Sequence, residues 1–356
     1  MHLINQKKIR EDKRKSIYSF ALTGICLAIP FVHDSKDKLP NIPTLFFNKS
    51  IYALIMCFLK LAFNREFQNF TNNSLFNFDK YFLYQIAIFS LLFSIFPTYL
   101  LGRASETANY SMICHISPII SFFSFFIQFF RNPTSHETNK QVIFAILAFI
   151  NTILLISQRI FRGLAEEDIP NILYELLLLF TSNFIFMLIP YFFELSDKEM
   201  KKGTKNESNL RFCIFFHFFN SIIFFIWALF TDGIDPIIVY FFKLLLLKRK
   251  DVLLGIFCST FYGNLKVIEF SRTFDPLLVE IVWYFYAIAG TIFGFYYGRD
   301  WTAGTVAENI LRVFGLFLIG FMVFFKCNSG FDAKNNEKEI TVNESDDETA
   351  SLLSKN

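Results

Sequence analysis

The sequence predicts an all-α polytopic membrane protein, with about ten transmembrane helices in two inverted five-helix repeats. Three observations support this fold class. Only 18% of the 356 residues are charged and 53% are hydrophobic, whereas an average soluble domain has about 25% charged residues. The charges gather at the chain ends and in short connectors, as a bilayer requires. The apolar runs between them are about 17–25 residues long, enough to cross ~30 Å of hydrocarbon.

The predicted elements follow in order along the chain. Residues 1–15 are polar and basic, and the apolar run 16–32 lacks the small-x-small pattern of a signal-peptide cleavage site, which indicates an uncleaved first span. The other spans of the first half, 16–158, are predicted at 45–63, 81–101, 108–130 and 141–158. A polar connector, 159–171, leads to the second half, 172–326, with spans at 172–194, 210–230, 252–270, 276–298 and 309–326. The polar tail, 327–356, is expected to be disordered.

The basic residues predict the orientation of these spans. An even number of spans places both termini on one side, and the basic N-terminus and the connector 198–205 then share the cytosol. The segment 235–251 does not fit this orientation, because it would lie on the outer side although it carries the basic residues Lys248, Arg249 and Lys250. Its apolar part is about 13 residues, too short to span comfortably, so we expect an interfacial helix. A crossing at this point would invert every later span.

Composition also bears on partners and cofactors. The net charge of +3 and the lack of a basic-aromatic patch argue against nucleic-acid binding. No C-x-x-C pair or ligand-spaced histidines occur, so neither a disulfide framework nor a zinc site is indicated, and no cofactor is expected. The six cysteines are interpreted as small packing residues. They are Cys26, Cys57, Cys114, Cys213, Cys258 and Cys327.

Two parts of the chain share the same order of features. The segment from Gly102 begins with a polar turn, continues into an apolar stretch, and reaches a charged turn at 131–134 before a closing span. The segment from Glu269 repeats this order, with its charged turn at 298–302. These segments occupy spans three to five and eight to ten. An odd number of spans in each half makes the halves run in opposite directions, as in many carriers.

Two motifs around span nine resemble the drug/metabolite transporter superfamily, which contains EamA-like permeases and nucleotide-sugar transporters. They are Arg-Thr-Phe-Asp-Pro-Leu at 272–277 and Tyr-Tyr-Gly-Arg-Asp-Trp-Thr at 296–302. The family usually has Gly-Glu where this chain has Gly298-Arg299. The resemblance covers most of the chain in architecture and a small part of it in motif. It implies ten helices in two inverted halves, cytosolic termini and alternating access around a central cavity, and it names no substrate.

Polar side chains inside the spans are the candidate substrate-binding residues, because each must face a partner or a water-filled cavity. Glu280 lies about one turn inside span nine, where a carboxylate could also flank the membrane surface. Lys266 and Glu269 could pair on one helix face or extend to the interface. His115 could couple transport to protons or be a structural histidine. The candidates are Asn109, His115, Glu175, Asn183, Asn264, Lys266, Glu280 and Tyr284. Comparable but less well placed on the cavity helices of the resembling family are Asn151, His217 and Asn220.

Two further motifs were assigned other roles. Gly290, Gly294 and Gly298 share one face of span nine, where small residues allow close helix packing. In the tail, Glu348 with Leu352 and Leu353 fits the acidic dileucine pattern read by clathrin adaptors, although such short patterns recur by chance. This pattern favours an endomembrane, either Golgi or endolysosomal and vacuolar, over the plasma membrane.

These observations favour a secondary carrier for a polar organic metabolite, which is not an enzyme. A membrane-embedded transferase is the first alternative, but the five histidines are scattered and no H-E-x-x-H motif occurs. A channel or receptor is the second, and no filter-like loop is present. The expected partners are a small solute, the lipid bilayer and a clathrin adaptor, and a homodimer is left open.

Overall fold

The computed structural model describes residues 2–29, 41–63, 80–104, 110–131, 136–166, 169–200, 209–246, 250–297 and 306–328. Within these ranges the secondary structure is helical throughout, with no strand, so the predicted all-α class is confirmed for this part of the chain.

The first five predicted spans correspond to a series of helices, some of them interrupted. They are α1 (His2–Ala28), α2 (Ile42–Phe63), α4 (Lys80–Ser90) continuing through the π-helix η2 (Leu91–Ile95) into α5 (Phe96–Ala104), then α6 (Tyr110–His115), the 3-10 turn η3 (Ser117–Ile119), α7 (Ile120–Arg131) and α8 (His136–Glu166). The turn η3 contains Pro118, whose missing N–H interrupts the α-helical hydrogen bonding between α6 and α7.

The second five predicted spans follow the same pattern. They are α9 (Ile169–Met200), α10 (Asn209–Thr231), the short α11 (Ile234–Leu245), α12 (Lys250–Gly255) continuing through the π-helix η4 (Ile256–Gly263) into α13 (Asn264–Thr273), and α14 (Pro276–Tyr297). A last helix, Val306–Asn328, is called the C-terminal helix below.

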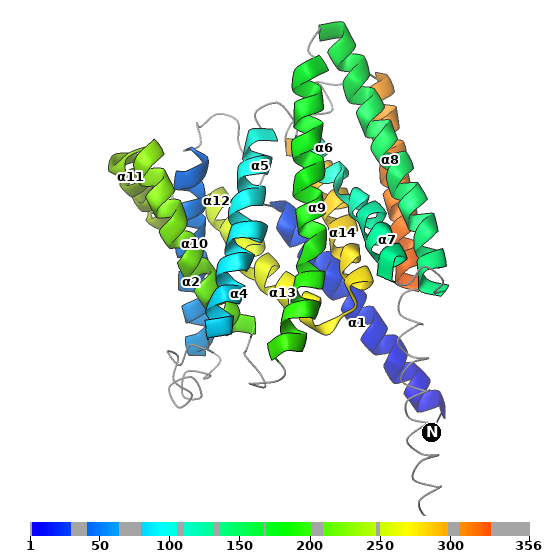
Figure 1. Cartoon of the computed structure of the whole chain (residues 1–356), viewed down its shortest axis with the longest axis horizontal. Helices are drawn as coiled ribbons and strands as arrows, with labels where there is room; N and C mark the ends of the chain where they lie inside the picture. Colours follow the sequence, from blue (N-terminus) through cyan, green and yellow to red (C-terminus); the bar gives the residue numbers. More distant parts are fainter. Residues whose placement is uncertain are drawn as a thin grey trace, which may run out of the picture.

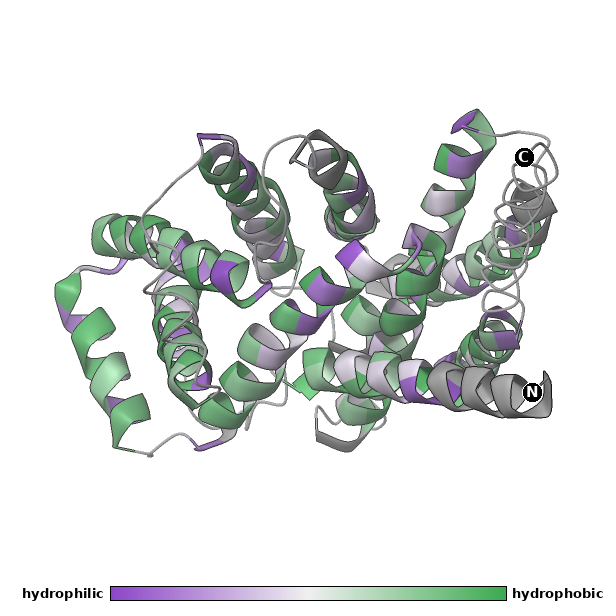
Figure 2. Ribbon diagram, turned by 90° about the horizontal axis from the view of Figure 1, so that it is seen from below, coloured by the Kyte–Doolittle hydropathy of each residue, from purple (hydrophilic) through white to green (hydrophobic). Residues whose placement is uncertain are grey.

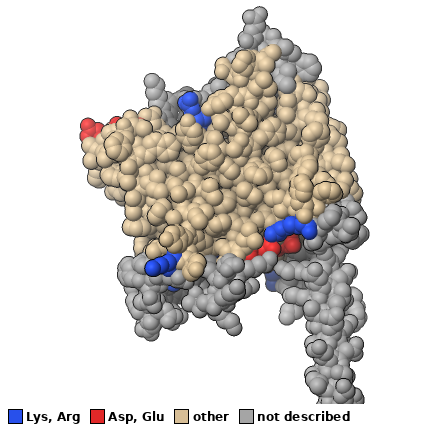
Figure 3. All heavy atoms as spheres, in the orientation of Figure 1, with Lys and Arg blue, Asp and Glu red and all other residues tan. Residues whose placement is uncertain are grey.

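Eight helices of the described ranges are long and apolar enough to cross a membrane. The two predicted spans outside this set are also helical: the basic α1, and α8, whose apolar part is the shorter stretch Gln141–Ser157. Large apolar side chains face outward, with Phe63, Phe130 and Phe230 each at least 80% exposed. In Figure 3 the charged residues lie near the upper and lower edges of the face, with an uncharged band between. The chain is therefore a multi-pass integral membrane protein.

Successive helices run in opposite directions through the bundle (Figure 1). α1 begins at the lower end of the view, where α9 also ends and α10 begins. α5 ends and α6 begins at the upper end, and the C-terminal helix runs from the upper end to the lower. In Figure 2, seen from below, hydrophobic residues predominate along the helices and hydrophilic positions are scattered among them.

The helices pack closely at a glycine position and through contacts between aromatic rings. α1 packs against α14 at Gly24, where an added Cβ would lie 2.5 Å from the Val282 carbonyl oxygen, so only glycine permits this approach. α2 packs along α10, and their aromatic rings meet at Phe46 and Phe224, with centroids 5.5 Å apart. The hydrophobic core consequently extends over both halves of the chain.

Three boundaries differ from the sequence-based expectation. α1 begins at His2, because the basic segment before the first span continues the same helix. The connector predicted at 159–171 is largely helical, since α8 extends to Glu166 and α9 begins at Ile169. The segment predicted to be interfacial forms the 12-residue α11, which buries Tyr240 and Leu244 against α2 and α12 and exposes Ile238 and Phe242. Its position at the interface stays a prediction.

Asp232 fixes the start of α2 to the connection between α10 and α11. Its carboxylate accepts a hydrogen bond from Asn41 Nδ2 at 2.6 Å and another from the Thr44 hydroxyl. Partial burial alone would raise the pKa of Asp232, but the hydrogen bonds from Thr44 and Asn41 outweigh it and lower this pKa below its usual value. Asp232 therefore serves as a charged cap for the first turn of α2.

Candidate functional site

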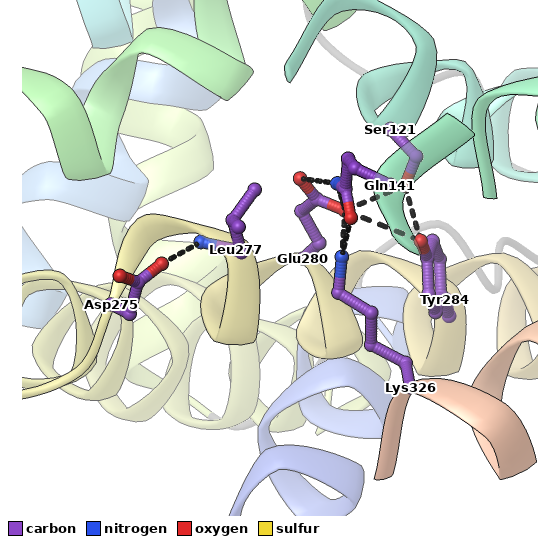
Figure 4. Close-up of polar contacts among 7 residues, drawn as sticks. All are labelled: Ser121, Gln141, Asp275, Leu277, Glu280, Tyr284 and Lys326. Atoms are coloured by element: carbon purple, nitrogen blue, oxygen red, sulfur yellow. Dashed lines mark hydrogen bonds and ion pairs between the residues drawn. The ribbon is translucent and has the colours of Figure 1, made fainter. Parts of the chain in front are cut away.

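Four helices bring five buried polar side chains together near the start of α14 (Figure 4). Lys326 of the C-terminal helix forms an ion pair with Glu280 of α14, with Nζ 3.0 Å from Oε2. Gln141 of α8 bridges the pair: its Nε2 donates to Glu280 Oε1 at 3.1 Å, and its Oε1 accepts from Lys326 Nζ at 2.7 Å. Ser121 of α7 donates to Glu280 Oε2 at 2.6 Å, and the Tyr284 hydroxyl donates to the same oxygen at 3.3 Å. Each of the five residues is 3% exposed or less.

The geometry of this network compensates for the removal of two charges from water. A buried ion pair is tolerated when further hydrogen bonds satisfy its remaining donors and acceptors, as Gln141, Ser121 and Tyr284 do for Glu280. Loss of one partner would leave a charge in the apolar bundle, which costs several kcal/mol. The network therefore holds α7, α8, α14 and the C-terminal helix in one mutual register.

Local sequence positions the α14 members of the network. α14 begins at Pro276, and the Asp275 carboxylate accepts the Leu277 N–H at 2.8 Å, which satisfies one free amide of the first turn (Figure 4). Glu280 and Tyr284 lie one turn apart on the same face of α14. The Glu280 carboxylate and the Tyr284 hydroxyl therefore both contact the Ser121 hydroxyl.

A second polar cluster surrounds His115, at the end of α6. Its Nε2 lies 3.0 Å from Asn151 Oδ1 of α8, and its Nδ1 lies 3.2 Å from the Thr291 hydroxyl of α14. The backbone of the C-terminal helix closes the site, since a Cβ added to Gly315 would lie 2.3 Å from Nε2. Thr291 also lies 2.7 Å from the Ala287 carbonyl oxygen. Its single hydrogen can point to that carbonyl or to Nδ1 of the neutral ring.

The two clusters lie on the same set of helices. Positions 280, 284, 287 and 291 follow one face of α14. An apolar layer lies between Glu280 and Thr291, and it contains Phe144, Ala148, Ala287, Ile319 and Met322. The unit of α6, α7, α8, α14 and the C-terminal helix thus carries polar contacts at two depths.

A third polar region lies on α10, next to both π-helical segments. Asn220 donates from Nδ2 to the Ser94 hydroxyl of η2 at 2.9 Å. The His217 imidazole faces the Thr260 main chain of η4 but does not reach hydrogen-bond geometry with it. Both nitrogens of His217 and Oδ1 of Asn220 are buried and lack hydrogen-bond partners among the described residues. π-Helical segments interrupt the regular α-helical ladder and often occur at functional sites.

The structure brings together two of the predicted site residues, Glu280 and Tyr284, and locates the others elsewhere. Lys266 pairs with Glu269 at 2.9 Å, one of the two alternatives left open by the sequence, and the two side chains are 24% and 37% exposed. Asn183 is buried on α9, where it donates to the Leu179 carbonyl at 2.8 Å. Glu175 is buried on the same helix, and Asn264 is partly exposed at the start of α13.

Several predictions fall on residues that are not described. Asn109, Gly298 and the sorting motif of Glu348, Leu352 and Leu353 lie outside the described ranges. Gly290 and Gly294 are buried in α14, and their proposed packing role stays a prediction.

The candidate residues did not include Ser121, Gln141 and Lys326 of the Glu280 network, nor Thr291 beside His115. Lys326 is the last residue of the predicted span 309–326 and Gln141 the first residue of the predicted span 141–158. The signal that could have found them is their position: each shares a helix face with another polar residue, Thr152 for Gln141 and Arg312 for Lys326. Thr291 was not named as a candidate; it lies between Gly290 and Gly294 in span nine.

Within the described ranges, no group of three or more His, Cys, Asp and Glu side chains is arranged to hold a metal ion.

Comparison with protein-family models, with curated proteins and with solved structures finds no match to this chain. The resemblance to the drug/metabolite transporter superfamily therefore stays a prediction based on its motifs.

Proposed function

We propose that the chain is a secondary carrier that moves a polar organic metabolite across an endomembrane by alternating access. The observation that carries the proposal is the position of the two π-helical segments. η2 interrupts the third predicted span of the first half, and η4 interrupts the third span of the second half. Interrupted helices at corresponding positions of two repeats are the best pointer to the solute site of such carriers.

Ten crossings follow if α1 and α8 are added to the eight membrane-length helices. The alternating directions of the helices support this count, because α1 begins and the C-terminal helix ends at the same side of the bundle (Figure 1). In this proposal both termini are cytosolic, and α11 lies along the opposite membrane surface.

The Glu280 network supports the division into two inverted halves. It joins Ser121 and Gln141, from spans four and five, to Glu280 and Lys326, from spans nine and ten. The last two spans of each half thus meet at one set of contacts. Ionisable residues inside membrane helices are expensive, and they commonly belong to the machinery of transport.

Purified protein reconstituted in liposomes tests this proposal. We expect uptake or exchange of a labelled solute from a panel of tritiated hexoses, nucleotide sugars and organic phosphates, without ATP. Glu280→Gln should reduce this transport at least tenfold, because the variant loses the charge that pairs with Lys326. Lys266→Gln is the matched control: it breaks a partly exposed pair and should keep transport within about twofold.

Other outcomes would contradict the carrier proposal. Solute-independent ion currents in the same liposomes would indicate a channel. A covalently altered solute would indicate a membrane-embedded enzyme. If the Glu280→Gln protein transports at the rate of the wild type, the Glu280 network is not part of the transport machinery.

A further inference from the structure

The two π-helical segments lie at the same depth of the bundle. η2 separates α4 from α5, and η4 separates α12 from α13. Asn220 of α10 bonds to Ser94 of η2 at 2.9 Å. His217, one turn earlier on α10, faces the Thr260 main chain of η4. Both interruptions are therefore level with one turn of α10, and helices bend more easily at such interruptions than elsewhere.

Pro190, inside α9, is a third interruption at this depth. Proline has no N–H to donate to the carbonyl of Phe186, and its ring crowds that carbonyl, so helices commonly bend at this kind of position. Phe192 follows Pro190, and its ring lies 5.4 Å from the ring of Phe93 in η2. Three neighbouring helices can thus bend at one level.

Beyond these interruptions, toward the lower end of Figure 1, the three helices are joined to one another. Gln85 of α4 donates to the Ser196 hydroxyl of α9 at 2.7 Å. The Arg272 guanidinium of α13 lies 4.9 Å from the centre of the Phe193 ring of α9. We call α4, α13 and residues 191–196 of α9 the lower unit, because these contacts connect all three segments.

The first part of α9 contacts a different group of helices through its aromatic rings. Phe184 lies 5.4 Å from Phe123 of α7. Phe186 stacks on Trp283 of α14, with centroids 5.2 Å apart. The Glu280 network holds α7 and α14 together with α8 and the C-terminal helix. The aromatic partners of α9 therefore change at the proline, from this group of helices to the lower unit and α10.

An ion pair joins the lower unit to the end of α7. Arg131, the last residue of α7, donates from Nη1 to Glu194 Oε2 at 2.9 Å. Its guanidinium also lies 5.3 Å from the centre of the Tyr191 ring. The two side chains of the pair are 36% and 28% exposed. Pairs with this much exposure are weak, so the contact can form and break during a conformational change.

We propose that the lower unit is a gate, which bends away from α7 about η2, Pro190 and η4, and that the Arg131–Glu194 pair holds the gate closed. α10 is one regular α-helix over Asn209–Thr231, so the gate stays attached on that side and opens on the side of α7. The group of α7, α8, α14 and the C-terminal helix keeps its own contacts during this motion. The inference rests on the proposed carrier function, for which the gate closes one end of the bundle.

Distances between pairs of spin labels on the purified full chain in lipid nanodiscs test the proposal. The gate pair, at Phe130→Cys and Leu195→Cys, joins α7 to the lower unit at side chains that are 80% and 58% exposed. The reference pair, at Ile153→Cys and Leu177→Cys, joins α8 to the first part of α9. Cys258→Ser removes the partly exposed native thiol, and the other five cysteines are buried.

Breaking the ion pair should shift the distances of the gate pair. We expect Glu194→Gln to raise the ratio of a longer distance to the short one about two- to fivefold, which is the contribution of a partly exposed pair. Arg131→Gln should raise the ratio further, because it also removes the cation–π contact with Tyr191. Lys266→Gln is the matched control: it breaks a pair of similar exposure inside α13 and should leave the ratio of the wild type.

The hinge is tested by a second substitution. Adding Pro190→Ala to Glu194→Gln should lower the ratio again, because alanine restores the N–H that the α-helical ladder lacks at this position. The distance of the reference pair should stay the same in every variant, because both of its labels lie outside the lower unit.

Three results would overturn the proposal. Unchanged distances of the gate pair in both ion-pair variants would show that the pair does not hold a gate closed. A longer distance that persists after Pro190→Ala would show that the proline is not a hinge. Equal lengthening of the reference pair would show that α9 moves as a whole. The measurement needs no solute, so its failure is distinct from a failure of the carrier proposal in liposomes.

Discussion

Replacement of Lys326 by Met is the most direct test of the ion-pair network. The substitution keeps an unbranched side chain of similar length, so its main effect is to leave Glu280 without its countercharge. Removing one partner of a buried pair typically costs about 3–5 kcal/mol. Gln141, Ser121 and Tyr284 still donate to the carboxylate, so we expect a loss of about 3 kcal/mol, at the low end of that range.

The double variant Glu280→Gln with Lys326→Met isolates the charge interaction. Both charges are absent in it, and a neutral amide can still meet Gln141, so its loss of stability should be below about 1 kcal/mol. The assay is reversible unfolding of the detergent-solubilised protein by SDS, with helicity as the signal.

Additivity would refute this reasoning. If the double variant loses the sum of the two single losses, the two side chains contribute independently and the pair is not an energetic unit. A loss below about 1 kcal/mol for Lys326→Met would have the same consequence, since exposed pairs are worth that little.

Two further substitutions test other contacts. Gly315→Ala should cost about 1–3 kcal/mol in the same unfolding assay, because its Cβ would meet the His115 ring at 2.3 Å; Gly320→Ala, with no atom within 4 Å, is the control and should be neutral. Equal stability of the two variants would contradict the close approach of the C-terminal helix to His115. Asp232→Asn should cost about 1 kcal/mol at neutral pH through the lost charged cap of α2. The folded-state pKa of Asp232 is lowered, so this contribution is present above the unfolded-state pKa and disappears as pH falls through the folded-state value. A difference that persists in acid would indicate another cause.

The sequence was sufficient to predict the helices, because a lipid bilayer requires long apolar runs, which the hydropathy pattern shows directly. It offered the Lys266–Glu269 pair as one of two alternatives, since residues three apart on a helix are neighbours, and the structure shows the pair. The short α11 was predicted as a separate helix for the same reason: its apolar run is too short for a span.

The remaining features depend on contacts between distant segments. Lys326 and Glu280 are 46 residues apart, and Gln141 lies 139 residues from Glu280, so no local pattern links them. The π-helical segments have no compositional signal, because the extra residue in the turn is accommodated by packing against neighbours. His217 was ranked low on its sequence position, and its unsatisfied nitrogens become visible only when α10 is packed between its neighbours.

α14 contributes to two sets of contacts at different depths, and this limits how the protein can move. Glu280 and Tyr284 bond to partners near one end of the helix, and Thr291 bonds to His115 eleven residues further on from Glu280. A slide of α14 by a single residue, about 1.5 Å, would stretch the contacts of both clusters at once. Any large rearrangement must therefore carry α7, α8, α14 and the C-terminal helix together as one rigid body. The sliding surfaces then lie at the borders of this body, where α14 meets α1 and α13 and where α7 and α8 meet α9.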